Sequence, residues 1–169
     1  MENPLNLSGS EHSINHHSFP AEVQIYGYNS DLYPNMSMAR QSVRGVVAVS
    51  LMVQIKGEEA RMDHDHMHSG LGAIVNKLGN IKFSGEVTNL DQFSLHSVLP
   101  STGEYVTYEG STTYPGYTKC KKLSFSVLKY FCRCWETVTW ILMNKPVYIS
   151  NQEMNKFHLL SQVGYIRYE

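Results

Sequence analysis

The pattern of hydrophobic and polar positions predicts several strands and few helices. Apolar and polar residues alternate over residues 23–28, which is the period of a strand with two different faces. Residues 45–55 form a β-branched run with few polar breaks, as expected for a central strand covered on both sides. Residues 137–143 predict another buried strand, and the Tyr/Thr-rich region that ends at Gly110 has shorter strand potential. The strand over residues 45–55 should be the deepest.

Two short helices complete the predicted elements. An apolar stripe at helical spacing, stopped by Gly79, predicts a helix over residues 69–78. Ser150 and Glu153 have the spacing of a capping box and predict a helix over residues 151–162. Because the helices do not alternate strictly with the strands, we expect a mainly β fold (α+β), with a central, mostly antiparallel sheet and peripheral helices.

Composition narrows the class of protein. With 169 residues, 42% of them hydrophobic, the chain is long enough for one domain with a core. A formal net charge of −1 provides no basic field for a phosphate backbone, so we expect no nucleic-acid partner. We expect no transmembrane segment, and the opening residues lack the features of a signal peptide. The three cysteines, Cys120, Cys132 and Cys134, define neither a disulfide framework nor a zinc knuckle.

Two ordered blocks of residues carry a family resemblance. The first is Ser10-Glu11-His12 with Ile14, Phe19, Glu22 and the strand VQIYGYN, and the second comprises YEGSTTYP (108–115), CWETVTWI (134–141) and NKPV (144–147). Together they resemble the α-carbonic anhydrases, and GSEHxIN and MNKPVYI are most similar to the non-catalytic carbonic anhydrase-related proteins X and XI. The resemblance implies a partial α-carbonic anhydrase domain over residues 9–116 and 134–162, with the N- and C-terminal parts missing. Residues 1–8 would be a non-family N-terminus and 163–169 a tail.

The resemblance also implies that the catalytic metal site is lost. In active relatives three histidines hold zinc, and the third histidine corresponds to Gln24 in this chain. The other two belong to an upstream strand that this sequence does not contain. Without imidazole ligands, no zinc-bound water with a pKa near 7 can form. We therefore expect no metal, no cofactor and no catalytic residues.

The supporting residues of that site are still present. By resemblance, Thr113 corresponds to the threonine that accepts from zinc hydroxide, and Glu11 to the buried glutamate to which that threonine donates. Glu22 corresponds to the carboxylate that orients the third histidine. We expect Glu11 and Thr113 to be a vestigial pair that satisfy each other's hydrogen bonds in a core.

Other histidines and two glycosylation sequons have plainer interpretations. His64, His66 and His68 favour a solvated loop, with weak divalent-cation binding as the alternative. His12 belongs to the family motif, whereas His16 and His17 are predicted to be surface residues. Asn6-Leu7-Ser8 and Asn35-Met36-Ser37 matter only if the chain enters the secretory route.

Residues 117–133 are predicted to be an insertion. This segment is basic and contains an apolar run without turn residues, and it separates Gly116 from Cys134, which are close in sequence in the family. A GT can form where the codons of Gly116 and Tyr117 meet, and Phe131-Cys132-Arg133 can be encoded by a pyrimidine tract that ends in AG. These signals indicate a retained intron or a misplaced exon boundary. A lineage-specific loop is the alternative. In secreted relatives the equivalent of Cys134 pairs with a cysteine that this chain does not contain, so Cys134 should be free or pair elsewhere.

The resemblance implies a function without hydratase activity. Intact relatives of the X and XI kind are secreted or cell-surface binding modules of the nervous system, which implies an extracellular location and a protein partner. The alternatives are a zinc-dependent carbonate dehydratase and a fragment with no function of its own. Because sheet edges would be unpaired, we expect the isolated chain to be aggregation-prone or poorly folded.

Overall fold

The structure, a computed structural model, describes residues 9–56, 70–81, 83, 86–91, 93–113 and 136–158. Its contacts form two compact units. The first unit contains residues 1–23, 51–104 and 143–169, and the second contains residues 24–50 and 105–142. The histidines at 64–68, the predicted insertion and the three cysteines lie outside the described residues.

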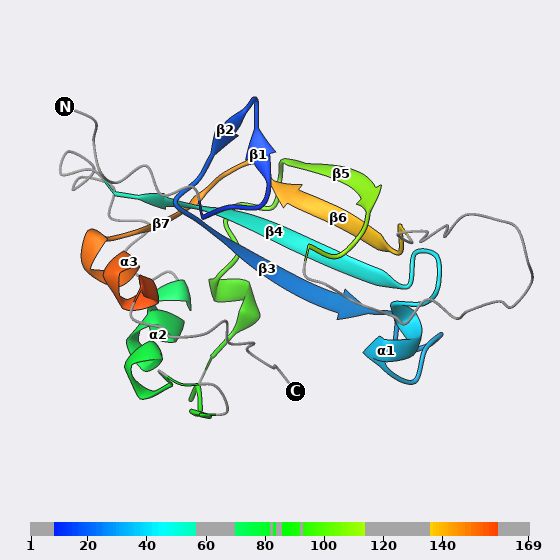
Figure 1. The fold of residues 1–169 in the computed structure, drawn as a ribbon, viewed down its shortest axis with the longest axis horizontal. Coiled ribbons are helices and arrows are strands. Elements are labelled where there is room, and N and C mark those ends of the chain that lie inside the picture. The colour runs from blue at the N-terminus through cyan, green and yellow to red at the C-terminus, as the bar shows by residue number, and fades with distance from the viewer. Residues whose placement is uncertain are drawn as a thin grey trace, which may run out of the picture. The chain divides into compact units, whose positions relative to one another are not determined.

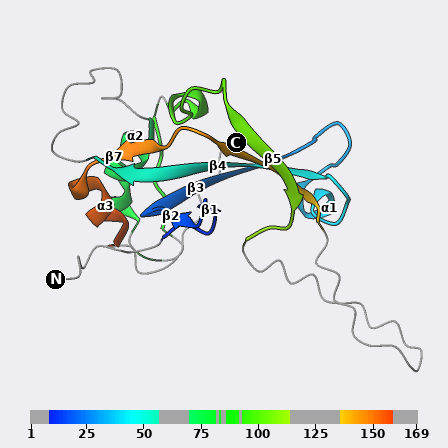
Figure 2. The same ribbon diagram turned by 90° about the horizontal axis from the view of Figure 1, so that it is seen from above.

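The main sheet has the strand order β3-β4-β6-β5, and β7 also pairs with β4. Its strands are β3 (Ala21–Tyr28), β4 (Val46–Ile55), β5 (Tyr105–Gly110), β6 (Val138–Met143) and β7 (Val147–Ile149). β4 is parallel to β6 and to β7, whereas β3 and β5 run in the opposite direction (Figures 1 and 2). The mainly β class with peripheral helices is confirmed, and the sheet is mixed. β6 and β7 pair with successive parts of β4 and run in the same direction. Pro146 lies between them and has no N–H to donate, so the strand is interrupted there, but the chain does not reverse.

The second unit has its core where the apolar runs predict it. Val46 and Ala48 of β4 are fully buried, whereas Val47 between them is 42% exposed. Val138 and Trp140 of β6 are fully buried at the same alternating spacing. Val46 lies opposite Val138 and Ala48 lies opposite Trp140 in the parallel ladder. Since burial of each large apolar side chain contributes about 1.5–3 kcal/mol, this register is strongly fixed.

A four-residue helix, α1 (Met36–Ala39), closes one end of this core. Ala39 is fully buried in the cluster, and Met36 packs against the cluster from outside. A Cβ at Gly45 would lie 2.0 Å from the carbonyl oxygen of Ala39. Only glycine therefore fits at this position, between α1 and the start of β4. The apolar periodicity did not predict α1, because four residues are too few to show a helical repeat.

β3 occupies its predicted position but does not show two faces of different burial. It begins at Ala21, and its first six residues are all half-buried. Glu22 and Gln24 are hydrogen-bonded to neighbouring segments, and Tyr26 is hydrogen-bonded to Gln24 on the same strand. The polar face of β3 therefore carries the residues of the candidate site.

In the first unit, two helices and β7 surround a second group of buried side chains. α2 (Gly70–Lys77) continues into a short 3-10 helix (Leu78–Asn80), in agreement with the predicted helix at 69–78. α2 contacts α3 (Asn151–His158) and a second 3-10 helix (Leu95–Ser97). A Cβ at Gly70 would lie 2.0 Å from the Oγ of Ser97, so glycine permits this close approach. The buried apolar residues of this unit include Leu51, Met52, Val53, Leu71, Val75 and Ile149.

The predicted capping box at the start of α3 is confirmed. The backbone N–H of Glu153 donates to Ser150 Oγ at 3.2 Å, and Glu153 Oε2 accepts from the backbone N–H of Ser150 at 2.7 Å. Both contacts satisfy donors that a helix start would otherwise leave unpaired. The described part of α3 ends at His158, so its predicted end at residue 162 is not tested.

A small hairpin near the N-terminus was not predicted. β1 (Ser13–Ile14) pairs antiparallel with β2 (His17–Ser18). The two turn residues, Asn15 and His16, both have positive φ angles of 51° and 62°. Two such residues form the type of turn that matches the twist of paired strands. With histidine in place of the usual glycine, the sequence signal was weak.

Candidate functional site

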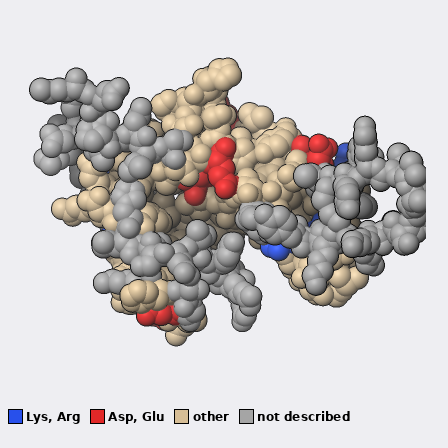
Figure 3. All heavy atoms as spheres, in the orientation of Figure 1, with Lys and Arg blue, Asp and Glu red and all other residues tan. Residues whose placement is uncertain are grey.

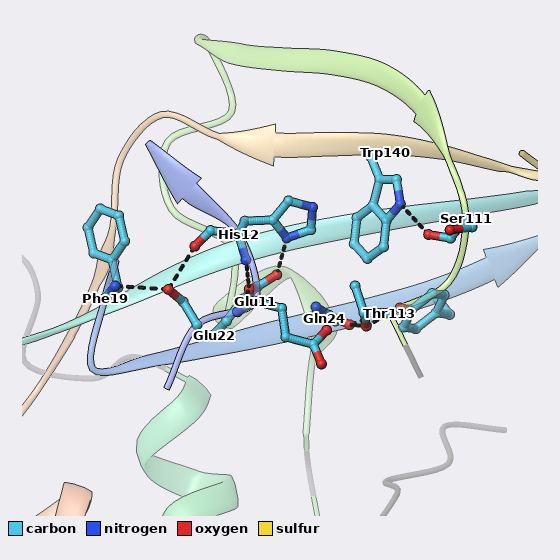
Figure 4. Close-up of polar contacts among 10 residues, drawn as sticks. Glu11, His12, Phe19, Glu22, Gln24, Ser111, Thr113 and Trp140 are labelled. Atoms are coloured by element: carbon cyan, nitrogen blue, oxygen red, sulfur yellow. Dashed lines mark hydrogen bonds and ion pairs between the residues drawn. The ribbon is translucent and has the colours of Figure 1, made fainter. Parts of the chain in front are cut away.

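Glu22 is the centre of one polar cluster, which lies wholly in the first unit. Its side chain is only 3% exposed, and Glu22 Oε1 lies 2.6 Å from Nδ1 of His12. Glu22 Oε2 accepts from the backbone N–H groups of Glu11 and His12 at 2.9 and 3.0 Å (Figure 4). A carboxylate that accepts several N–H donors at these distances makes charge-assisted hydrogen bonds. Glu22 therefore fixes the backbone of the Ser-Glu-His motif.

Ser10 holds the other side of this motif. Its Oγ accepts from the backbone N–H of Phe19 at 2.9 Å and donates to the carbonyl oxygen of His12 at 2.7 Å (Figure 4). The backbone N–H groups of Gly9 and Ser10 both donate to the carbonyl oxygen of Phe19. These bonds join the segment before the hairpin to the segment after it, so the hairpin has a hydrogen-bonded base.

A second polar cluster lies in the second unit and is centred on Gln24. The Oε1 of Gln24 accepts from the hydroxyl of Thr113 at 2.7 Å and from the hydroxyl of Tyr26 at 2.8 Å (Figure 4). The two hydroxyl oxygens lie 3.3 Å apart. Gln24 and Tyr26 meet because residues two apart on a strand share a face. The three polar atoms thus form a triangle in which Gln24 accepts the proton of each hydroxyl.

An aromatic group supports this triangle. The ring of Tyr26 packs edge-on against Trp140, with centroids 5.6 Å apart, and Tyr108 stacks on Trp140 at 6.3 Å. The indole N–H of Trp140 donates to the carbonyl oxygen of Ser111 at 3.0 Å (Figure 4). Since Ser111 is two residues before Thr113, this bond anchors the segment that carries the threonine. Trp140 therefore positions both hydroxyl donors of the triangle.

Charged side chains of the described residues form small, separate groups on the face shown in Figure 3. Arg44 lies 3.7 Å from Glu109 and Lys77 lies 4.0 Å from Asp91, and all four side chains are substantially exposed. Exposed pairs of this kind stabilise a fold by at most about 1 kcal/mol.

The structure places the predicted site residues in two clusters. Glu22 lies with Glu11 and His12, and Gln24 lies with Thr113. Glu11 is exposed, so the expectation that it is buried in a core is wrong. Its backbone N–H is held by Glu22, which allows the side chain to remain at the surface. Direct pairing of Glu11 with Thr113 stays a prediction.

Two residues have roles that sequence reasoning missed. His12 was assigned only to a motif, but it is the ring partner of Glu22. The sequence analysis does not include Tyr26 in the site. The alternation of β3 was a signal that could have placed Tyr26 there. His16 and His17 are exposed, as predicted.

Comparison with known proteins identifies the family to which these clusters belong. The family model for eukaryotic-type carbonic anhydrase matches residues 3–126. The chain belongs to the eukaryotic-type carbonic anhydrase family. This confirms the resemblance at family level, and similarity to the related proteins X and XI in particular stays a prediction. The division into domain segments, including 117–133, also stays a prediction.

Two relatives from Caenorhabditis elegans match most of this carbonic anhydrase-like chain. Putative carbonic anhydrase-like protein 2 is 40% identical over 146 residues, which cover 86% of this chain and 36% of the relative. Putative carbonic anhydrase-like protein 1 is 35% identical over 161 residues, which cover 94% of this chain and 37% of the relative. The chain thus spans little more than a third of the length of these two relatives.

The residues present do not fit the zinc ion that is typical of carbonic anhydrases. Among the described residues, no three His, Cys, Asp or Glu side chains lie together as a metal site. The amide oxygen of Gln24 already accepts two hydrogen bonds, which use both of its lone pairs, and its amide nitrogen is a donor. No zinc-dependent step can be derived for this arrangement. Within the described part of the chain, no helix has the length and apolar character needed to span a membrane.

Proposed function

We propose that this carbonic anhydrase-like chain has no hydratase activity and acts as an extracellular protein-binding domain. The absence of hydratase activity is proposed from the two hydrogen bonds that Gln24 accepts. At the position that resemblance assigns to the third zinc ligand, its amide oxygen is held by the hydroxyls of Thr113 and Tyr26. An imidazole nitrogen binds zinc through a free lone pair, and this amide has no such lone pair left.

Tyr26 supplies a second reason for inactivity. By resemblance, the hydroxyl of Thr113 would contact a zinc-bound hydroxide in an active relative. In this chain that hydroxyl donates to Gln24 and lies 3.3 Å from the hydroxyl of Tyr26. We infer that both hydroxyls are engaged by Gln24 and need no zinc-bound hydroxide as a partner. Since the ring of Tyr26 packs on the fully buried Trp140, its position is fixed by the core.

Zinc content and CO2 hydration test this half of the proposal. The purified chain should contain no tightly bound zinc and should not accelerate CO2 hydration. An active α-carbonic anhydrase assayed in parallel should contain zinc and accelerate hydration. Gln24→His should remain without activity, because the hydroxyls of Tyr26 and Thr113 would still lie beside the side chain at position 24. One equivalent of tightly bound zinc with turnover in the unmodified chain would instead establish a carbonate dehydratase, the alternative function.

The binding role rests on the family resemblance and on one exposed strand. Tyr105 and Val106 of β5 are 58% and 62% exposed, and Tyr108 is 41% exposed. Aromatic side chains are enriched at protein interfaces, so this strand is a candidate contact surface. Saturable binding of the labelled chain to neuronal cell surfaces, sensitive to protease treatment of the cells and lost in Val106→Lys, would support the role. Absence of binding would favour a fragment with no function of its own.

A further inference from the structure

The glycosylation sequon Asn35-Met36-Ser37 coincides with the start of α1 in the second unit. Asn35 and Ser37 are exposed, whereas Met36 between them is half-buried against the core cluster. α1 follows β3 and precedes β4 at one end of these strands (Figures 1 and 2). The sequon is thus held in one orientation, with its two essential side chains at the surface.

The two ends of the Asn35 amide have different roles. Its Oδ1 accepts a hydrogen bond from the backbone N–H of Met38 at 2.9 Å, and this bond caps α1. Within the described residues, no acceptor lies at hydrogen-bond distance from its Nδ2. The Asn35 backbone is extended, with φ −161° and ψ 163°. The nitrogen that would carry a glycan is therefore the end of the amide that the fold does not use.

We propose that Asn35 is an N-glycosylation site whose glycan the folded domain accommodates without loss of the helix cap. In this reaction Nδ2 attacks the anomeric carbon of an oligosaccharide carried on a lipid diphosphate. A carbon–nitrogen bond forms, the bond from that carbon to the diphosphate oxygen breaks, and the amide loses one proton. The lipid diphosphate is the leaving group. The Asn35 amide keeps its carbonyl oxygen, so the bond to Met38 can persist.

The neighbouring residues meet the requirements of this modification. The position between Asn35 and Ser37 is methionine rather than proline, and Ser37 provides the hydroxyl that the acceptor sequence needs. Met36 contacts the core from α1, so exposed Asn35 can project a bulky, solvated group away from it. The proposal rests on the extracellular location proposed above, because glycan transfer takes place in the secretory route.

Translation of the full chain behind a cleavable leader, in the presence of microsomes, tests the modification. Asn6→Gln removes the other sequon and gives a background in which only Asn35 can be modified. This background should show one glycan that endoglycosidase H removes. Asn35→Gln and Ser37→Ala should each lose the glycan, whereas Ser37→Thr should keep it. Leader cleavage and protection from added protease show that the chain has been imported.

An imported Asn6→Gln chain with no glycan, or with a glycan that survives Ser37→Ala, would overturn the assignment. Hydrogen exchange then tests the cap, with Ser37→Ala as the control that lacks the glycan but keeps Asn35. Residues 36–40 should exchange equally slowly in the glycosylated and Ser37→Ala chains, and faster exchange in the glycosylated chain would contradict retention of the cap. These results do not depend on zinc content or cell binding, so failure here is distinguishable from failure of the proposed function.

Discussion

At the scale of single residues, Glu22 has a structural role that is independent of any metal. It brings together two backbone N–H groups and an imidazole ring at a point where only 3% of its side chain is exposed. Removal of a buried acceptor leaves its donors unpaired, which usually costs more than the bond contributed. Glu22 therefore has a role in folding that these contacts explain.

Replacement of Glu22 tests this role. Glu22→Ala should lower the free energy of unfolding by about 3 kcal/mol, because a partner of a buried pair is lost and two N–H groups lose their acceptor. Glu22→Gln keeps one carbonyl oxygen and should lose less. Urea unfolding of the two variants measures the difference, with the exposed Glu136→Gln as a control of the same chemistry. Equal stability of Glu22→Ala and the control would refute the role.

Tyr26 allows a similar test in the second unit. Tyr26→Phe keeps the ring on Trp140 but removes the hydroxyl that donates to Gln24. We expect a loss of about 1 kcal/mol, since Thr113 still donates to Gln24. Tyr148→Phe is the matched control because that tyrosine is 40% exposed and is in the other unit. If urea unfolding shows equal stability for the two variants, the triangle contributes nothing to the fold.

At the scale of elements, the sequence predicted the long strands and both main helices but not the short elements. β4 and β6 have enough β-branched residues to show their burial, and the capping box marks the start of α3. The β1–β2 hairpin and α1 contain too few residues for any period. For the candidate site, resemblance selected Glu22, Gln24 and Thr113. The partners His12 and Tyr26 came only from tertiary structure, because no sequence pattern shows which side chains meet.

The cap of α3 gives a prediction at this scale. Ser150→Ala removes the acceptor for the N–H of Glu153 and should cost about 1 kcal/mol of unfolding free energy. Ser150→Thr keeps the hydroxyl oxygen and should remain close to the original chain. Because α2 packs against α3, the Ala variant should also speed hydrogen exchange in α2. A Thr variant as unstable as the Ala variant would show that the hydroxyl is not the cause.

At the scale of the whole molecule, β5 has the properties of a sheet edge that no other described strand covers. It is the last strand in the order β3-β4-β6-β5, and all of its residues except Gly110 are exposed. Edge strands with exposed apolar side chains pair readily with other chains. This feature gives the expected aggregation of the isolated chain a specific location.

Val106→Lys tests that location. A lysine on an edge strand disfavours pairing with a second chain, so the variant should remain monomeric at concentrations at which the original chain associates. Size-exclusion chromatography over a range of concentrations measures the shift. Val43→Lys is a suitable control because Val43 is 67% exposed and lies outside the strands. Association that both lysines reduce equally would indicate a general effect of charge.

The hydrogen bonds of Glu22 also bear on how activity is inferred from motifs. A motif search based on Ser-Glu-His followed by Glu22 would select residues that contact one another in this structure. In this chain, the motif marks the architecture of one turn. By the family resemblance, the position that would decide zinc binding is 24, two residues further along the same strand.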